Sequence, residues 1–418
     1  MGRIKNNLEQ LLFYLIIFFP IIFFFRSFIL NFTVILISLI FIFVSINENY
    51  KFWKFQYNKV LLFFFIYFFL SQFFFNFELD KLLKSMFLIK FFFLFNATIY
   101  VFSKINIDFL RKKIKYLIYL LFFFILDLFL QYFTGINVFG FEGSYCGYEY
   151  LLPQKECLRY SGIFGSELVA GGYISIVVMS VFILILLLFD KFYLNLIPLL
   201  LLIAVFFSGE RTALILTLIF NIIYFIFVFK FNLKKFLLSV LVIFLFIFFV
   251  KDNSIIRHSV DTLGLLKNED NLSLVDSLKT TPWGLHYTAS ILMIKEKPLF
   301  GNGYKSFRVN CHNYEFLNIR TQRRHAVCSS HPHNFHLEVM VDSGILGYLI
   351  LLASVYFFLK RYFQYEELKK NKLLLMMFLY LITFIFFPRP TGSIFSTFFG
   401  SMFWYFIGSV LGYTNLKK

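Results

Sequence analysis

The chain has 418 residues, of which 60% are hydrophobic and only 15% are charged, with a formal net charge of +17. Soluble domains carry about 25% charged residues, so this composition excludes an ordinary soluble enzyme. The basic residues form short clusters between apolar segments, which is the positive-inside pattern of membrane proteins and not a basic groove for nucleic acid. The 67 phenylalanines are interpreted as filling lipid-facing positions. We therefore predict an all-α polytopic membrane protein.

Apolar stretches approach or exceed the roughly 18–20 residues that span a hydrocarbon core about 30 Å thick. About twelve transmembrane helices are predicted, at 8–25, 28–46, 60–75, 86–103, 116–133, 167–189, 192–208, 213–229, 236–250, 336–359, 373–387 and 393–413. The first nine fall within 1–250, with a polar loop at 134–165. A larger polar loop fills 251–335, and the last three helices lie within 336–418. The first segment lacks a small-residue cleavage site, which indicates a signal anchor.

An even number of spans predicts that both termini lie on one side of the membrane. The Lys/Arg-dense loops favour the cytoplasm for that side: 47–59, 104–115, 230–235 and 360–372. Both long polar loops would then face outward, where disulfides form. Each holds two of the four cysteines, which allow three pairings. Because each pair is local within one loop, we predict Cys146–Cys157 and Cys311–Cys328.

The larger outer loop has structure of its own. The stretch 281–298 predicts a helix, because Pro282 stands near its start and Pro298 ends it. GNGY, at 301–304, predicts a turn. Four arginines lie between this helix and the next apolar segment: Arg308, Arg320, Arg323 and Arg324. Any one of them could be an ordinary solvated charge, but a cationic loop at a membrane surface suits an anionic lipid diphosphate.

The most informative stretch is HPHNFH, at 331–336, since all seven histidines of the chain lie between 258 and 336. The proline restricts His331 to an extended conformation. Asn334 predicts the N-cap of the following helix. His333 would then lie just outside a helix N-terminus, which favours an anion. A neutral imidazole there could accept a proton from an alcohol while a phosphate leaves.

Two alternatives to this interpretation stay open. Polar packing at the membrane interface would explain His331, His333 or His336 taken singly. A zinc site could instead draw on the HxH pair and four further residues, namely Cys311, His312, His325 and Cys328. The cysteines fit better as disulfide partners outside the cell, and no second carboxylate cluster accompanies them. We therefore predict no metal.

Two more charged residues lie at predicted helix boundaries. Arg211, in SGERTA at 208–213, separates two apolar segments. A charge at that depth is costly and suggests phosphate binding, with a local ion pair to Glu210 as the alternative. Glu167 would cap the helix predicted at 167–189, where the helix dipole alone favours an acidic residue. A catalytic or substrate-binding role for Glu167 is the other interpretation.

The segment 331–347 resembles the signature of the O-antigen ligase and polymerase superfamily, in which His-Asn is followed after nine residues by Gly-x-x-Gly. In this chain the pattern is matched by His333 and Asn334, then by Gly344 and Gly347. The two glycines stand about one helical turn apart and would let another helix approach closely.

Three further stretches resemble the same superfamily. SGERTA resembles its arginine motif, and RYSGIFGSELVAGG, at 159–172, resembles a segment common in its bacterial members. GLHYTASILMIKEKPLFGNGYKSFR, with Cys311 and Cys328 after it, is also similar. The resemblance spans about 159–347.

The resemblance implies a metal-independent, inverting glycosyltransferase of the GT-C type, without a cofactor, in the bacterial inner membrane. It would move a glycan from undecaprenyl diphosphate to an acceptor hydroxyl at the periplasmic face, in O-antigen and lipopolysaccharide biosynthesis. The acceptor would be lipid A-core for a ligase or the growing glycan for a polymerase. Membrane lipids are implied partners, with a chain-length regulator as a further candidate.

The resemblance also assigns roles. His333 would be the catalytic base and Arg211 would bind the diphosphate. His331, Asn334 and Glu167 are further substrate-binding candidates, from their positions in the sequence. Related ligases often carry a second arginine on the loop helix, where this chain has His286. Either His286 takes that position, or an arginine such as Arg308 reaches in, or the diphosphate is held less tightly.

A transporter or flippase is the alternative function, with the outer loop as a lid. Such proteins are expected to show intramembrane charge pairs and repeated halves. No convincing inverted repeat is visible, and buried charge is sparse, with Lys90, Asp127 and Arg211 as the candidates. The chain also has no GxxxxGK[ST] loop for a nucleotide motor.

Overall fold

The computed structural model describes residues 2–74, 79–145, 158–189, 196–228, 281–311, 328–364, 371–386 and 389–414, with single positions at 194, 237, 240, 241, 244, 246, 250, 258 and 416. This part of the chain is helical. Its β-structure is limited to one antiparallel pair of two-residue strands, β1 (Ser144–Tyr145) and β2 (Leu158–Arg159), and an isolated bridge between Ile136 and Glu142. The predicted all-α class is confirmed.

The N-terminal helices are α1 (Gly2–Ile17), α2 (Phe19–Ile22), α3 (Ser27–Asn47), α4 (Gln56–Ser71), α5 (Leu79–Met86), α6 (Ile89–Lys104) and α7 (Ile107–Thr134). The middle of the chain forms α8 (Ala170–Tyr173), a π-helical turn (Ile174–Val178), α9 (Met179–Leu188), α10 (Ile197–Ser208) and α11 (Arg211–Phe227). Then follow α16 (Pro282–Glu296), α17 (Phe307–Asn310), α18 (Phe335–Phe363), α20 (Lys372–Phe384) and α21 (Thr397–Thr414). Short 3₁₀ turns occur at Phe52–Lys54, Gln72–Phe74 and Gly162–Phe164.

Several helices are suited to a membrane. Five are long and apolar enough to cross one, namely Ser27–Asn47, Leu79–Lys104, Ile107–Thr134, Ala170–Leu188 and Phe335–Phe363. Five more are apolar but shorter than 18 residues. Large side chains remain exposed on the flanks, such as Phe28, Tyr119 and Ile226, as expected where lipid replaces water. The chain is thus built as a multi-pass membrane protein, but the expected number of about twelve spans is not confirmed.

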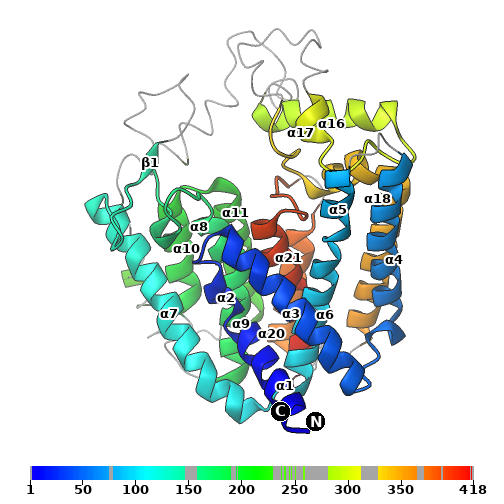
Figure 1. Cartoon of the computed structure of the whole chain (residues 1–418). Helices are drawn as coiled ribbons and strands as arrows, with labels where there is room; N and C mark the ends of the chain where they lie inside the picture. Colours follow the sequence, from blue (N-terminus) through cyan, green and yellow to red (C-terminus); the bar gives the residue numbers. More distant parts are fainter. Residues whose placement is uncertain are drawn as a thin grey trace, which may run out of the picture.

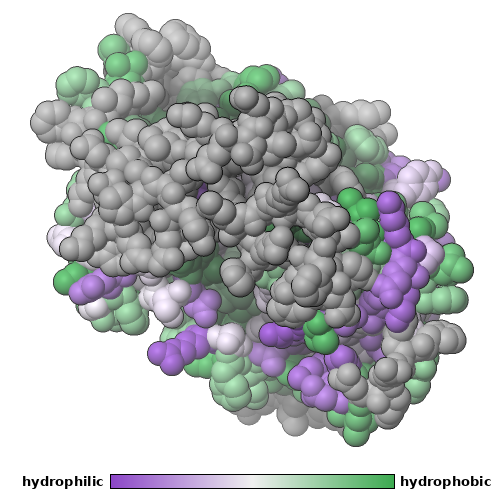
Figure 2. Space-filling view, turned by 90° about the horizontal axis from the view of Figure 1, so that it is seen from above, coloured by the Kyte–Doolittle hydropathy of each residue, from purple (hydrophilic) through white to green (hydrophobic). Residues whose placement is uncertain are grey.

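Figure 1 shows how the ends of the bundle differ. α1 begins and α21 ends at one end, while α16 and α17 lie across the other. Seen from the α16 end, hydrophilic residues gather on part of the face, beside hydrophobic residues that belong to the flanks (Figure 2). The elements predicted to form the outer loop therefore cover the end of the bundle opposite the chain's first and last helices.

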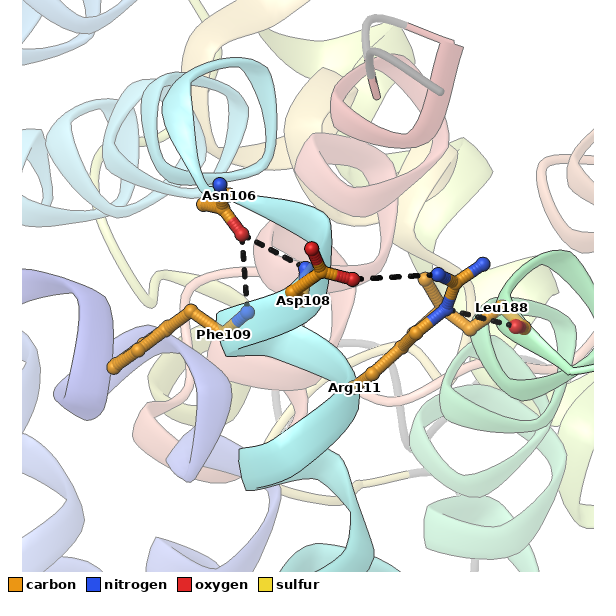
Figure 3. A network of polar contacts seen from close by, with 5 residues as sticks. All are labelled: Asn106, Asp108, Phe109, Arg111 and Leu188. Carbon is orange, nitrogen blue, oxygen red and sulfur yellow. Dashed lines mark hydrogen bonds and ion pairs between the residues drawn. The ribbon is translucent and has the colours of Figure 1, made fainter.

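Two predicted boundaries were wrong. The segment expected to begin at 116 begins at Ile107, because the Asn106 side chain accepts hydrogen bonds from the backbone N–H of Asp108 and Phe109 (Figure 3). Arg111, expected in a loop, is therefore helical, and its Nε donates to the Leu188 carbonyl at the end of α9 over 3.2 Å. The first segment is interrupted after Ile17, and Pro20 lies within the short α2 that follows.

Candidate active site

α16 begins where the sequence predicts. The Thr281 hydroxyl accepts from the Gly284 N–H and Pro282 occupies the first helical position, where its missing N–H costs nothing. The apolar face of α16 packs in a small core separate from the main one. That core comprises Leu285, Ala289, Met293, Phe307, Cys311 and Val341. Cys311 and Cys328 form the expected disulfide, whereas Cys146 and Cys157 lie outside the described residues.

α18 is not the straight helix that was predicted. Gly344 breaks it with φ 71° and ψ −178°. The turn after α16 supplies the missing partners: the Ile345 N–H donates to the Pro298 carbonyl (2.8 Å), and the Val341 carbonyl accepts from the Asn302 N–H (2.7 Å). A Cβ at residue 344 would lie 2.1 Å from the Leu299 oxygen. Gly344 thus admits a loop backbone, not the helix that the spacing suggested.

The second glycine of the motif does admit a helix. A Cβ at Gly347 would lie 2.9 Å from Cε1 of Tyr67, on α4. Tyr67 also donates from its hydroxyl to the Ser343 carbonyl over 3.1 Å, at the kink itself. The first part of α18, residues 335–343, is therefore held between the turn after α16 and the body of the bundle.

The buried Asp342 carboxylate ties that turn to α18. One oxygen accepts from the Lys305 N–H (2.9 Å), and the other accepts from the N–H (3.2 Å) and hydroxyl (3.0 Å) of Ser306. Lys305 has a positive φ of 55°. Asp342 is thus engaged in organising the backbone between α16 and α17.

The N-terminus of α18 follows the prediction. Asn334 is its N-cap and accepts from the Leu337 N–H over 3.1 Å. His333, immediately before the cap, has a φ of 53°, a left-handed conformation that is uncommon for residues other than glycine and that often marks functional sites. Its ring centroid lies 4.2 Å from that of His331 and 5.2 Å from that of His286 on α16. Three histidines predicted separately thus form one cluster.

The loop before α21 completes the cluster, and its role was not foreseen. The Thr391 N–H donates to the His333 carbonyl over 2.7 Å, and the Thr391 hydroxyl accepts from the Phe335 N–H over 2.8 Å. The Asn334 side-chain amide contacts the Arg389 carbonyl over 3.5 Å. This loop contains PRPTG, at 388–392, which was not among the candidate site residues. Its arginine between two prolines, directly after an apolar segment, was the signal that could have drawn attention to it.

The imidazoles of the cluster are biased towards the neutral form. Burial, together with the neighbouring His333 and a smaller contribution from His286, lowers the pKa of His331 to about 3, although the Thr391 backbone acts in the opposite direction. Burial also lowers the pKa of His333. Both rings are therefore available as proton acceptors at neutral pH.

These pKa shifts predict a loss of stability in mild acid. Between pH 6.5 and about 3 the unfolded chain binds a proton at His331 that the folded protein resists, so the free energy of unfolding should fall as pH falls below 6.5. The slope is at most about 1.4 kcal/mol per pH unit for one histidine. Thermal unfolding in detergent at pH 7.5, 6.5 and 5.5 measures it, and H331N should flatten the dependence. An unchanged slope in H331N would contradict this assignment.

Arg211 lies beside the same assembly. It is the first residue of α11, and its guanidinium carbon is 5.7 Å from the centroid of the Trp283 ring. Trp283 belongs to the first turn of α16, three residues before His286. α16 therefore connects the start of α11 to the histidine cluster.

The predicted cap of the segment at 167–189 was assigned to the wrong acid. The Glu210 carboxylate accepts from the N–H groups of Gly171 (2.7 Å) and Gly172 (3.1 Å), at the start of α8. Glu167 lies on the exposed stretch before that helix. α8 is therefore capped by Glu210, in the turn before α11, and not by the acidic residue nearest to it in the sequence.

Of the remaining candidates, Arg308 is exposed on α17. It lies within electrostatic range of Tyr304 and Lys305. The zinc alternative loses two ligands because Cys311 and Cys328 are joined, and His312 and His325 lie outside the described residues. Within the described part of the chain, no group of three or more His, Cys, Asp or Glu side chains is arranged to hold a metal ion.

Comparison with known proteins finds similarity to one family. Residues 196–352 match the family described as O-antigen ligase, a stretch that includes Arg211, His286 and His333 and stops short of Arg389. A 77-residue stretch is 31% identical to a Rickettsia felis protein named as a polysaccharide ligase. That match covers 18% of this chain and 18% of the relative, so less than a fifth of either protein is compared. Residues 196–352 of this chain are therefore similar to the O-antigen ligase family.

Proposed function

We propose that this protein transfers a glycan from undecaprenyl diphosphate to an acceptor hydroxyl, either by ligation to lipid A-core or by extension of a growing chain. The observation that carries the proposal is the convergence of His333 and His286 at the N-terminus of α18, with the Arg211 guanidinium over the ring of Trp283, which belongs to the same helix α16 as His286. The family match over 196–352 supports the same class of reaction.

The proposed chemistry is an in-line displacement. The His333 imidazole accepts the proton of the acceptor hydroxyl as its oxygen attacks the anomeric carbon. The bond between that carbon and the diphosphate oxygen breaks, and the diphosphate leaves with the electron pair. Arg211 offsets the charge that develops on it. Attack opposite the leaving group inverts the anomeric centre, and the proton on His333 is afterwards lost to water.

The proposed setting is the bacterial inner membrane, with both termini in the cytoplasm and the histidine cluster at the periplasmic face. The lysine- and arginine-rich segments favour that orientation, and a disulfide between Cys311 and Cys328 is compatible with an oxidising compartment. The arrangement would let a lipid-linked donor remain in the bilayer while its headgroup reaches α16 and the start of α18.

A reconstituted transfer assay tests the function. Purified full-length protein in proteoliposomes should convert a glycan carried on undecaprenyl diphosphate, with an added acceptor, into a longer or acceptor-linked product. R211A should abolish product while leaving the unfolding temperature within a few degrees of wild type. If wild-type protein moves the donor across the bilayer without forming product, the transporter hypothesis replaces this one. In cells, deletion separates the two transferase types: a lost ligase leaves lipid-linked polymer in the membrane, and a lost polymerase leaves single-repeat lipopolysaccharide.

A further inference from the structure

The backbone at Arg389 and Thr391 is hydrogen-bonded to the residues at the N-terminus of α18. The Arg389 carbonyl lies 3.5 Å from the Asn334 side-chain amide, and two residues later the Thr391 N–H donates to the His333 carbonyl over 2.7 Å. Arg389 therefore holds a defined position next to the N-terminus of α18, although it comes from the loop between α20 and α21.

The side chain of Arg389 is half-buried, and two of its three nitrogens lack an acceptor among the described residues. Its guanidinium carbon lies 4.5 Å from the centroid of the Phe384 ring, while Nε and Nη2 are buried with no hydrogen-bond partner in the part of the chain that the structure describes. Burial lowers the pKa of Arg389 to about 10, so it remains charged at neutral pH. Buried guanidinium N–H groups without an acceptor cost free energy that a bound anion would recover.

Both Arg389 and Arg211 lie near α16. Tyr287 on α16 is hydrogen-bonded to Asn334 and lies within electrostatic range of Arg389, while Trp283 on the same helix carries the Arg211 guanidinium over its ring. Residues four apart lie on one face of a helix, about 6 Å apart along its axis. The Arg211 guanidinium thus lies against this face of α16, and Arg389 lies within electrostatic range of the same face.

We infer that Arg389 binds a phosphate of the lipid-linked donor and so supplies the second cation of the site. The inference rests on the proposed function and deepens it, because it assigns the position that His286 left open. An imidazole lacks the permanent charge and the bidentate fork of a guanidinium. With Arg211 at one end of this face and Arg389 at the other, the site would grip a diphosphate from both sides.

Binding measurements on full-length protein in phosphatidylcholine nanodiscs test this. R389Q should weaken the binding of undecaprenyl diphosphate about 10- to 100-fold, because a charge-assisted hydrogen bond is lost. R389K should fall between R389Q and wild type. Binding of undecaprenol, which has no phosphate, should not change. Inorganic diphosphate should compete with the lipid in wild type and compete less well in R389Q, which separates recognition of the phosphates from recognition of the lipid.

Arg361 provides a matched control, since it also stacks on an aromatic ring, that of Phe55 at 5.5 Å, but stands at the other end of α18. R361Q should bind as wild type does. If R389Q and R389K both bind undecaprenyl diphosphate as tightly as wild type, the inference is overturned while the proposed function stands. If R389Q does not fold, wild-type affinity in R389K alone overturns it. A wild-type protein that neither binds undecaprenyl diphosphate nor transfers glycan rejects the proposed function itself.

Discussion

Replacing His333 with asparagine should lower the rate of glycan transfer by about 10²- to 10⁴-fold, the range that a general base supplies. Asparagine is the informative substitution because it tolerates the left-handed backbone that His333 adopts, at φ 53°. It therefore removes the imidazole and preserves the turn that leads into α18. The measurement is kcat for a lipid-linked donor in proteoliposomes, with the affinity for the donor measured separately.

The pH profile distinguishes a base from a merely structural residue. Wild type should lose activity in acid as the His333 imidazole becomes protonated, at a pH below the ordinary histidine value because burial lowers the pKa of His333. In H333N the residual rate should not follow that titration. H331N keeps the proposed base and should retain the acid limb. Wild-type activity in H333N would exclude His333 from the chemistry.

Replacing Gly344 with alanine should prevent stable folding, or lower the free energy of unfolding by roughly 3 kcal/mol or more. Two costs combine at this position. The backbone, at φ 71° and ψ −178°, lies in a region that is essentially restricted to glycine. The new Cβ would also meet the Leu299 oxygen at 2.1 Å and the Phe300 nitrogen at 2.6 Å, and neither backbone atom can rotate away. Thermal unfolding of purified protein measures the effect.

Gly140 separates these two costs. It has a similar φ of 81°, but a Cβ there would have nothing within 4 Å. G140A should therefore show only the backbone cost, about 1 kcal/mol, and should remain folded. If G344A were no less stable than G140A, the tight contact between α18 and the turn after α16 would be refuted.

Local interactions explain what the sequence alone could predict. The start of α16 follows from Thr281 and Pro282, and the start of α18 follows from Asn334, because a cap bonds to an N–H only three residues away. The Cys311–Cys328 disulfide joins residues separated by 17 positions within one loop. Apolar length and composition were likewise sufficient to predict helices of membrane-spanning length, such as Ser27–Asn47.

Contacts between distant segments decided the rest. Glu210, and not the nearby Glu167, caps α8 because its carboxylate reaches residues 39 and 38 positions away. A glycine at position 344 is compatible with close packing of either a helix or a loop, and only the tertiary structure shows that a loop packs there. Thr391 bonds to Phe335 across 56 residues, a pairing that no local pattern encodes. The sequence by itself therefore determined the class of fold, the caps of α16 and α18 and the candidate histidines, whereas tertiary packing decided that Arg389 lies beside those histidines.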